Sequence, residues 1–147
     1  MIPRISQAPQ VSELTTEFLN TLRQNGFTGD ISSTYADRLT MATDNSIYQL
    51  LPQAVIFPRS TADVTIVARL VDEPRFHSLS LTPRGGGTGT NGQALTEGIV
   101  VDLSRYMKRI IEINPEQRWV KVEAGVIKDE LNLFLKPYRS EERRVGK

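Results

Sequence analysis

The stretch from Arg84 to Gly92, RGGGTGTNG, constrains the fold of this chain more than any other. Its five glycines in eight positions let the backbone take positive φ and let a ligand approach the main chain without interference from Cβ atoms. Successive N–H groups in such a turn form a concave anion nest, which suits a phosphate or a pyrophosphate. Arg84 adds a candidate charge-assisted donor, and neutral donors follow at Thr88, Thr90 and Asn91. We therefore expect this loop to bind the pyrophosphate of a dinucleotide.

Two common nucleotide-binding motifs do not fit the sequence around the loop. Residues 87–92 spell G-x-G-x-x-G, but a Rossmann motif needs a helix between two parallel strands. Only residues 93–97 separate the loop from the strand pattern at 98–103, whereas such a crossover takes about a dozen residues or more. No Lys-Ser or Lys-Thr pair closes the glycine run, which excludes a P-loop. A long glycine-rich surface loop without a ligand stays open as an alternative.

Composition excludes several classes of function. The 147 residues suffice for one domain with a core, and the single histidine, His77, cannot build a zinc site by itself. Without cysteine, this chain has no disulfide, thiolate nucleophile or iron–sulfur ligand. A net charge of +1 with scattered basic residues does not favour nucleic acid. We find no apolar run of the roughly 20 residues that a membrane span needs, and no secretory signal is expected.

The last nine residues, RSEERRVGK at 139–147, are polar and without periodicity. They equal the translation of a common DNA-sequencing adapter, AGATCGGAAGAGCGTCGTGTAGGGAAA, read in frame. We therefore expect residues 139–147 to be an adapter-derived, non-native tail, so that the native protein continues beyond Tyr138. Without this tail the net charge changes from +1 to −1. A genuine charged tail is the alternative.

Hydrophobic periodicity predicts helices and strands in an α+β order. Helices are expected at 12–25, from Ser60 onward and at 128–135, and strands at 54–57, 99–103, 110–113 and 119–123. The last two strands form a hairpin through the turn at 114–117. Residues 27–45 are polar and turn-rich. The inward positions are expected to be Val64, Val67, Ala68 and Val71 in the second helix, and Leu131, Phe134 and Leu135 in the third.

Four motifs occur in order along the chain: PRSTADV at 58–64, PRGGGTGT at 83–90, VDLSR at 101–105 and VEAGV at 122–126. Together they resemble the N-terminal half of a PCMH-type FAD-binding domain, as found in vanillyl-alcohol-oxidase-like flavoproteins. Within that group the chain is most similar to bacterial FAD-linked D-2-hydroxyacid dehydrogenases of the D-lactate and D-2-hydroxyglutarate class, in their large forms with a fused iron–sulfur region. The resemblance covers residues 34–138.

The resemblance implies an incomplete α+β PCMH-type domain at 34–138, preceded by a helical lead-in at 1–33. Its cofactor is FAD, and noncovalent binding is expected because His77, the only histidine, lies outside the loop. An iron–sulfur cluster is expected only in a C-terminal region that this chain lacks. The cofactor-binding residues carried over from the family are Pro58, Arg84, Gly85, Gly86, Gly87, Thr88, Gly89, Thr90, Asn91, Gly92, Gly125 and Val126.

The implied activity of the whole protein is oxidation of a D-2-hydroxy acid by hydride transfer to FAD. No catalytic residue and no metal ligand is assigned within this chain, which alone is expected to be inactive and to fold poorly. The partners are a small-molecule substrate and an electron acceptor that the sequence does not identify, with a cytoplasmic location that can include the inner face of the membrane. Two alternatives stay open: a stand-alone nucleotide- or anion-binding module without redox activity, and a flavoprotein similar to enolpyruvyl-sugar-nucleotide reductases.

Several other residues receive structural interpretations. Asp37, Arg38 and Asp44 are polar candidates for cofactor contacts, but their sequence context favours turn and cap roles. Structural roles are also expected for Asp102 and Arg105 after the strand at 99–103. The aromatic residues Tyr106 and Trp119 are expected in the core or the hairpin, and His77 in a solvent-facing connection.

Overall fold

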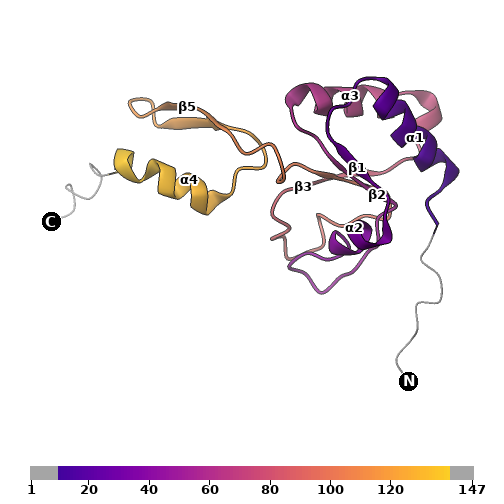
Figure 1. Cartoon of the computed structure of the whole chain (residues 1–147). Coiled ribbons are helices and arrows are strands. Elements are labelled where there is room, and N and C mark those ends of the chain that lie inside the picture. Colours follow the sequence, from indigo (N-terminus) through magenta and orange to yellow (C-terminus); the bar gives the residue numbers. More distant parts are fainter. Residues whose placement is uncertain (1–9, 140–147) are drawn as a thin grey trace.

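The computed structural model describes residues 10–139, and a four-stranded sheet lies at the centre of the main body (Figure 1). Its order is β1-β2-β4-β3, with β1 at Asp30–Ser32, β2 at Ala54–Phe57, β3 at Leu81–Arg84 and β4 at Ile99–Asp102. β1 runs antiparallel to β2, whereas β2 and β3 both pair with β4 in parallel. The carboxyl ends of β2, β3 and β4 therefore meet at one edge of the sheet.

Helices cover both faces of this sheet. α1 (Glu13–Gln24) and α3 (Thr61–Val71) lie on one face, and α2 (Tyr35–Thr40) lies on the other together with the loops that follow α2 and β3 (Figure 1). Ser12 caps α1 by accepting the N–H of Thr15, and Ser60 caps α3 in the same way, as the sequence predicts. A 3-10 turn, η1 (Pro74–Phe76), follows α3.

The core has a layer on each side of the sheet, because all residues of β2 and β4 are buried. Phe18 of α1 and Phe76 of η1 meet edge to face, with ring centroids 5.2 Å apart. The layer under α1 and α3 includes Phe18, Leu22, Ala54, Ile56, Val67, Leu70, Phe76, Ile99 and Val101. The layer on the opposite face is smaller and contains Val55, Phe57 and Val100, packed against the partly buried Met41 and Tyr106.

The expected helices and strands are confirmed, but two short elements lie in the segment expected to be turn-rich. β1 has three residues and α2 has six, too few for a periodic pattern. β3 includes Pro83. Because β3 is the edge strand, Pro83 can occupy it without removing a hydrogen bond from the ladder.

The inward face of α3 differs by about one position from the expected one. Val67 is buried as expected, but the other buried positions are Asp63 and Leu70, whereas Ala68 is exposed. α3 carries apolar side chains all round, so periodicity alone cannot orient it. Its rotation follows from Asp63, whose buried carboxylate accepts the main-chain N–H groups of Thr28 and Arg59, both at 2.8 Å.

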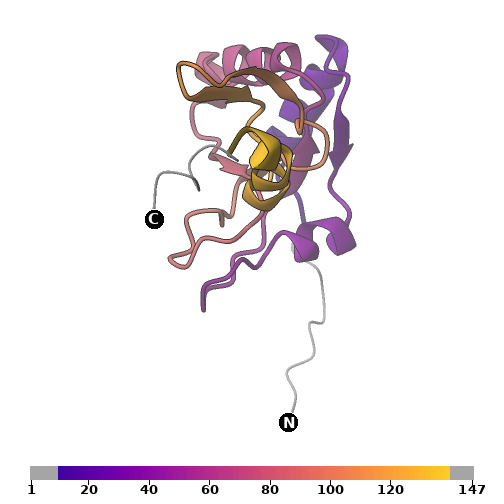
Figure 2. The same ribbon diagram turned by 90° about the vertical axis from the view of Figure 1, so that its left-hand side faces the viewer.

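The last elements form a separate unit that projects from the main body (Figure 1). It consists of β5 (Ile110–Asn114), β6 (Trp119–Val122) and α4 (Lys128–Leu135), followed by the 3-10 turn η2 (Lys136–Arg139). In Figure 2, which looks from that end, α4 and the hairpin lie in front of the body. No residue of β5, β6 or α4 is buried. We call this part of the chain the hairpin–α4 unit.

Two contacts join the hairpin–α4 unit to the body and close its base. Gly125 donates its N–H to the carbonyl of Met107 at 2.8 Å, and a Cβ on Gly125 would lie 2.0 Å from the carbonyl oxygen of Leu103. The glycine is therefore required by close approach of two main chains. The exposed guanidinium of Arg109 binds the buried carboxylate of Glu123 through two hydrogen bonds at 2.7 and 2.9 Å.

The expected inward face of α4 is wrong at one position. Leu131 and Leu135 are half-buried, but Phe134 is 42% exposed, because nothing in the described chain covers that side of the helix. Trp119 lies in the hairpin as expected and donates its indole N–H to Gln117. The predicted tail at 139–147 lies, except for the backbone of Arg139, outside the described residues.

We predict that Asp63→Ala destabilises the body by about 2–4 kcal/mol, because the main-chain N–H groups of Thr28 and Arg59 lose a buried acceptor. Asp72→Ala, at the exposed end of α3, is the matched control and should cost less than about 0.5 kcal/mol. Urea unfolding of the 147-residue chain measures both changes. Equal losses for the two variants would contradict the role given to Asp63.

We also predict that amides of β5 and β6 exchange with solvent faster than those of β2 and β4. A two-stranded hairpin without a buried side chain is marginally stable at best, and local opening of such a unit is cheap compared with global unfolding. Hydrogen exchange on the 147-residue chain, resolved by residue, tests this difference. Equal protection of both groups would mean that the hairpin–α4 unit is stabilised by contacts other than those described.

Candidate functional site

The segments that leave the carboxyl edge of the sheet bring the predicted cofactor-binding residues together. Pro58 follows β2, the glycine loop follows β3, and Leu103 follows β4. Arg84 is level with Asp102 in the parallel pairing, and the N–H of Leu103 donates to the carbonyl of Arg84 at 2.9 Å. Gly125 lies against Leu103 from the other side. Ligands of parallel sheets bind at this edge.

The glycine loop crosses between two parallel strands without a helix, as expected from its spacing. Gly87 has φ +64° and Gly92 has φ +73°, both in the left-handed region that favours glycine. Within residues 10–139, no acceptor is recorded for the main-chain N–H groups of residues 85–90. A run of unpaired donors in a turn fits an anionic group such as the pyrophosphate of a dinucleotide.

The end of the loop is closed by its own residues. Asn91 donates its N–H to the side-chain oxygen of Gln93 at 3.0 Å, and Leu95 donates to the carbonyl of Gly92 at 3.0 Å. The Gln93 amide also lies within 2.4 Å of the position that a Cβ on Gly89 would take. The run of consecutive unpaired donors is therefore interrupted at Asn91. No signal in the sequence distinguishes Gln93 from an ordinary loop residue, and sequence analysis missed it.

The side chain of Arg84 binds protein oxygens in this structure. Its guanidinium donates to the carbonyl of Thr43 at 2.7 Å and reaches the carbonyl of Met41 at 3.5 Å. The loop is thereby tied to the segment that follows α2, and the two lie together below the sheet in Figure 1 and Figure 2. Donation by Arg84 to a phosphate stays a prediction.

Asp37 in α2 and Asp44 after it have the cap and turn roles that their context favours, whereas Arg38 in α2 instead binds a distant carbonyl. Asp37 accepts hydrogen bonds from Ser32 and Thr34, in that order the main causes of its lowered pKa. The buried Arg38 donates its Nε–H to the carbonyl of Pro52 at 2.6 Å, and burial lowers its pKa. Asp44 accepts the N–H of Ser46 at 2.8 Å.

Residues after β4 are also structural. Asp102 Oδ1 accepts the N–H groups of Ser104 and Arg105 at 2.8 and 3.0 Å, which closes a turn. Arg105 stacks on the ring of Phe57, with its guanidinium carbon 3.7 Å from the ring centroid. Both roles agree with expectation.

Tyr106 packs partly against the smaller core layer, and its hydroxyl belongs to a surface network. It donates to Asp30, which also accepts from Arg59 at 3.1 Å, and these two hydrogen bonds, Tyr106 first, lower the pKa of Asp30. His77 is exposed, as expected for a connection, and its Nε2 lies 2.9 Å from the carbonyl of Asp72. Neither residue belongs to the glycine loop.

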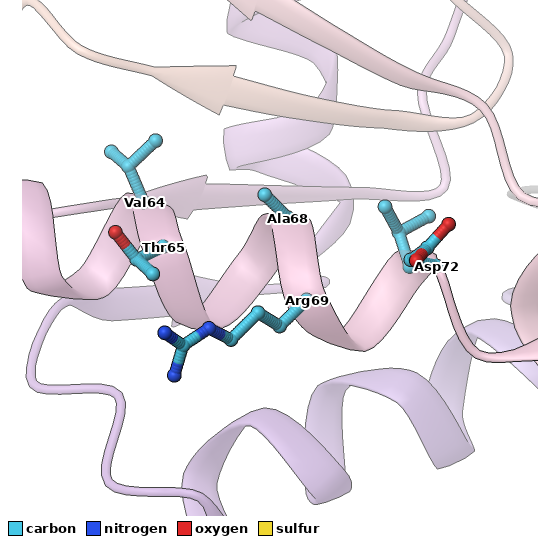
Figure 3. A pocket seen from close by; sticks show the side chains of 6 residues that line it. Val64, Thr65, Ala68, Arg69 and Asp72 are labelled. Atoms are coloured by element: carbon cyan, nitrogen blue, oxygen red, sulfur yellow. The ribbon is translucent and has the colours of Figure 1, made fainter.

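A shallow groove of about 480 Å³ lies on the outer surface of α3, away from the carboxyl edge. Figure 3 shows Val64 and Ala68 on one side of this helix and Arg69 on the other. Val64 and Ala68, which line the groove, were expected to face the core, whereas Val71 at its end packs against the core layer as expected. Three of its six lining residues are apolar, and all six belong to α3 or its C-cap. Such a lining does not match a dinucleotide.

The described part of the chain contains neither a cluster of metal-ligating side chains nor a membrane-spanning helix. Across residues 10–139 no three His, Cys, Asp or Glu side chains gather where they could hold a metal ion. Over the same residues, no helix has the length and apolar character to cross a bilayer. The glycine loop at the carboxyl edge is therefore the strongest candidate site.

The fold and the open loop define a nucleotide-binding unit, and comparison with known proteins identifies its family. The sequence pattern of the family described as "FAD binding domain" matches residues 52–140. The chain belongs to this FAD-binding family. Its arrangement is similar to the solved structure of an alkyldihydroxyacetonephosphate synthase, with a TM-score of 0.74 and 17% identity over 93% of this chain and 27% of that one. This likeness supports the α+β PCMH-type fold.

Two curated relatives give the more particular similarity. The chain is 70% identical to D-2-hydroxyglutarate dehydrogenase of Escherichia coli (strain K12) over 138 residues, which are 94% of this chain and 14% of the relative. It is 34% identical to the mitochondrial D-lactate dehydrogenase [cytochrome] of Kluyveromyces lactis over 88 residues, 57% of this chain and 15% of the relative. The chain thus spans about a seventh of the length of each of these two relatives.

We predict that Gly87→Ala lowers the free energy of unfolding by about 1–2 kcal/mol, since alanine at positive φ is strained. A Cβ on Gly87 would also lie 2.4 Å from Nη2 of Arg84. Gly85→Ala is the matched control, because its Cβ would meet nothing within 4 Å, and it should change stability by less than about 0.5 kcal/mol. Urea unfolding distinguishes the two, and equal effects would contradict the loop geometry.

Proposed function

We propose that this chain is the N-terminal part of the FAD-binding domain of an FAD-linked dehydrogenase that oxidises D-2-hydroxyglutarate. The observation that carries the proposal is the 70% identity to D-2-hydroxyglutarate dehydrogenase over 138 residues, compared with 34% to a D-lactate dehydrogenase over 88. The run of unpaired N–H groups at 85–90 supports FAD as the ligand, because it offers donors to a pyrophosphate.

In this proposal the chain binds and orients the cofactor. The N–H groups of residues 85–90 would hold the pyrophosphate of FAD, while Pro58, Gly125 and Val126 lie on segments that meet the same edge of the sheet. Each hydrogen bond to an ionised phosphate oxygen contributes about 1.5–3 kcal/mol. When bound, FAD supplies a hydride acceptor for the hydroxyl-bearing carbon of the substrate. Residues that handle the substrate and its proton belong to parts of the relatives that this chain does not span.

The domain limits are proposals of the same kind. The match to the relative of Escherichia coli comprises 138 residues, and the predicted PCMH-type segment ends at residue 138. The family pattern extends to residue 140, two residues into the proposed tail, so the tail from residue 139 onward rests on its agreement with the adapter translation. Resequencing the gene tests the tail directly, since a native reading frame that ends at Lys147 would contradict it. The iron–sulfur region, the electron acceptor and the cytoplasmic location stay predictions from the resemblance.

The other two functions have less support. A stand-alone anion-binding module would not require 70% identity to one segment of a much longer dehydrogenase. For a flavoprotein of the enolpyruvyl-reductase kind, no observation on the described residues speaks in favour.

We predict that the longer protein encoded by the intact gene is yellow, and that D-2-hydroxyglutarate added without oxygen bleaches its flavin band. D-lactate is the control substrate and should bleach it at least about tenfold more slowly, a difference of about 1.4 kcal/mol in transition-state binding. Gly87→Val should yield a colourless protein, because a branched side chain cannot take positive φ there. A fully loaded Gly87→Val protein would overturn the role of the loop, and a flavin that only D-lactate reduces would overturn the substrate.

A further inference from the structure

The segment from Met41 to Ser46, which we call the clasp, is bound to the glycine loop at two points. Arg84 donates from the loop to the carbonyls of Thr43 and Met41, at 2.7 and 3.5 Å. In the opposite direction, the N–H of Asn45 donates to the carbonyl of Gly87 at 3.0 Å. The conformation of the loop therefore depends on a segment about forty residues earlier in the chain.

Asp44 lies between these two points of attachment. Its Oδ1 accepts the N–H of Ser46 at 2.8 Å, and its Oδ2 is buried without a hydrogen-bond partner in the described part of the chain. Hydrogen bonding from Ser46 and, to a smaller extent, the positive charge of Arg84 and the backbone N–H of Ala94 lower the pKa of Asp44. Asp44 thereby closes the turn whose two neighbouring residues, Thr43 and Asn45, are the ones bound to the glycine loop.

Arg84 in turn packs directly on the turn of the loop. A Cβ on Gly87 would lie 2.4 Å from Nη2 and 2.9 Å from Cζ of its guanidinium. The guanidinium thus occupies the space that a side chain at Gly87 would need, and the positive φ of Gly87 favours glycine there. If Arg84 moved away from the clasp, its guanidinium would lose the contact with Gly87.

From these contacts we infer that Asp44 and Arg84 are positioning residues: they hold the clasp against Gly87 and so keep the N–H groups of residues 85–90 open to an anion. The identity of that anion as FAD pyrophosphate rests on the proposed function. Neither side chain contacts the ligand in this arrangement. Arg84 acts through the carbonyls of Met41 and Thr43, and Asp44 acts through Arg84 and the Ser46 turn.

The sign of one substitution separates this inference from a direct phosphate contact by Arg84. If Arg84 bound the phosphate, the negative charge of Asp44 would compete for it, and Asp44→Asn would tighten FAD binding. In the positioning arrangement, Asp44→Asn weakens the hold on Arg84 and loosens the loop, so FAD binding becomes weaker. Removal of a negative charge near an anion site would by itself tighten FAD binding, whereas the positioning role predicts that Asp44→Asn weakens it.

The experiment measures the Kd of FAD for the apoprotein of the longer protein, with Asp44→Asn, Arg84→Met and the double variant. We expect each single variant to bind FAD at least about tenfold more weakly, and the double variant within about threefold of the weaker single, because residues of one network are not additive. Asp37→Asn is the matched control and should stay within about twofold. Its carboxylate accepts from Ser32 and Thr34, and its recorded hydrogen bonds involve no residue of the glycine loop. Tighter binding by Asp44→Asn, unchanged binding or additive losses would overturn the inference.

A second measurement decides without FAD. The N–H of Asn45 is protected by its bond to Gly87, so its hydrogen exchange in the 147-residue chain should become about tenfold faster with Asp44→Asn or Arg84→Met, a local loss of about 1.4 kcal/mol. Asp37→Asn should leave it unchanged. Unchanged exchange in Asp44→Asn and Arg84→Met overturns the positioning role. If exchange is faster in these two variants but the wild-type protein binds no FAD, only the proposed ligand is overturned.

Discussion

The parallel pairing of β3 with β4 through a connection that contains no helix is the constraint on which the site depends. A chain that must reverse twice within residues 85–98 to return in parallel needs tight turns, and glycine adopts them at the lowest steric cost. Because few N–H groups of such turns form hydrogen bonds within the chain, several donors stay unpaired. The residues that allow the chain to reverse therefore also present the row of unpaired donors to which we assign an anion.

The elements with strong patterns were predictable from sequence. The buried strands β2 and β4 and the capped helices α1 and α3 carry long apolar runs or Ser caps, and these signals are local. β1 and α2 were missed because their three and six residues derive their structure from neighbours: β1 from pairing with β2, and α2 from packing under it. The rotation of α3 was also misjudged, since Asp63 orients it through contacts with residues remote in sequence.

For the site, sequence located the loop but not its supports. The glycine run marks the loop that we propose for the dinucleotide, because its residues are contiguous in sequence. The contacts of Arg84 with Thr43, of Asn45 with Gly87 and of Gln93 with Asn91 join residues whose partnership has no pattern. The hydrogen bonds of Arg84 to the clasp could not be predicted from sequence, because an arginine beside a glycine loop is more simply expected to contact a phosphate.

Pro83 has a consequence beyond its place in β3. An outermost strand ordinarily offers a ladder of free amides on which a foreign β-segment can grow. The imide nitrogen of Pro83 interrupts that ladder in its middle, so an incoming strand finds no continuous template there. Pro83, the residue directly before the glycine loop, thus also hinders the pairing of this sheet edge with a strand of another molecule.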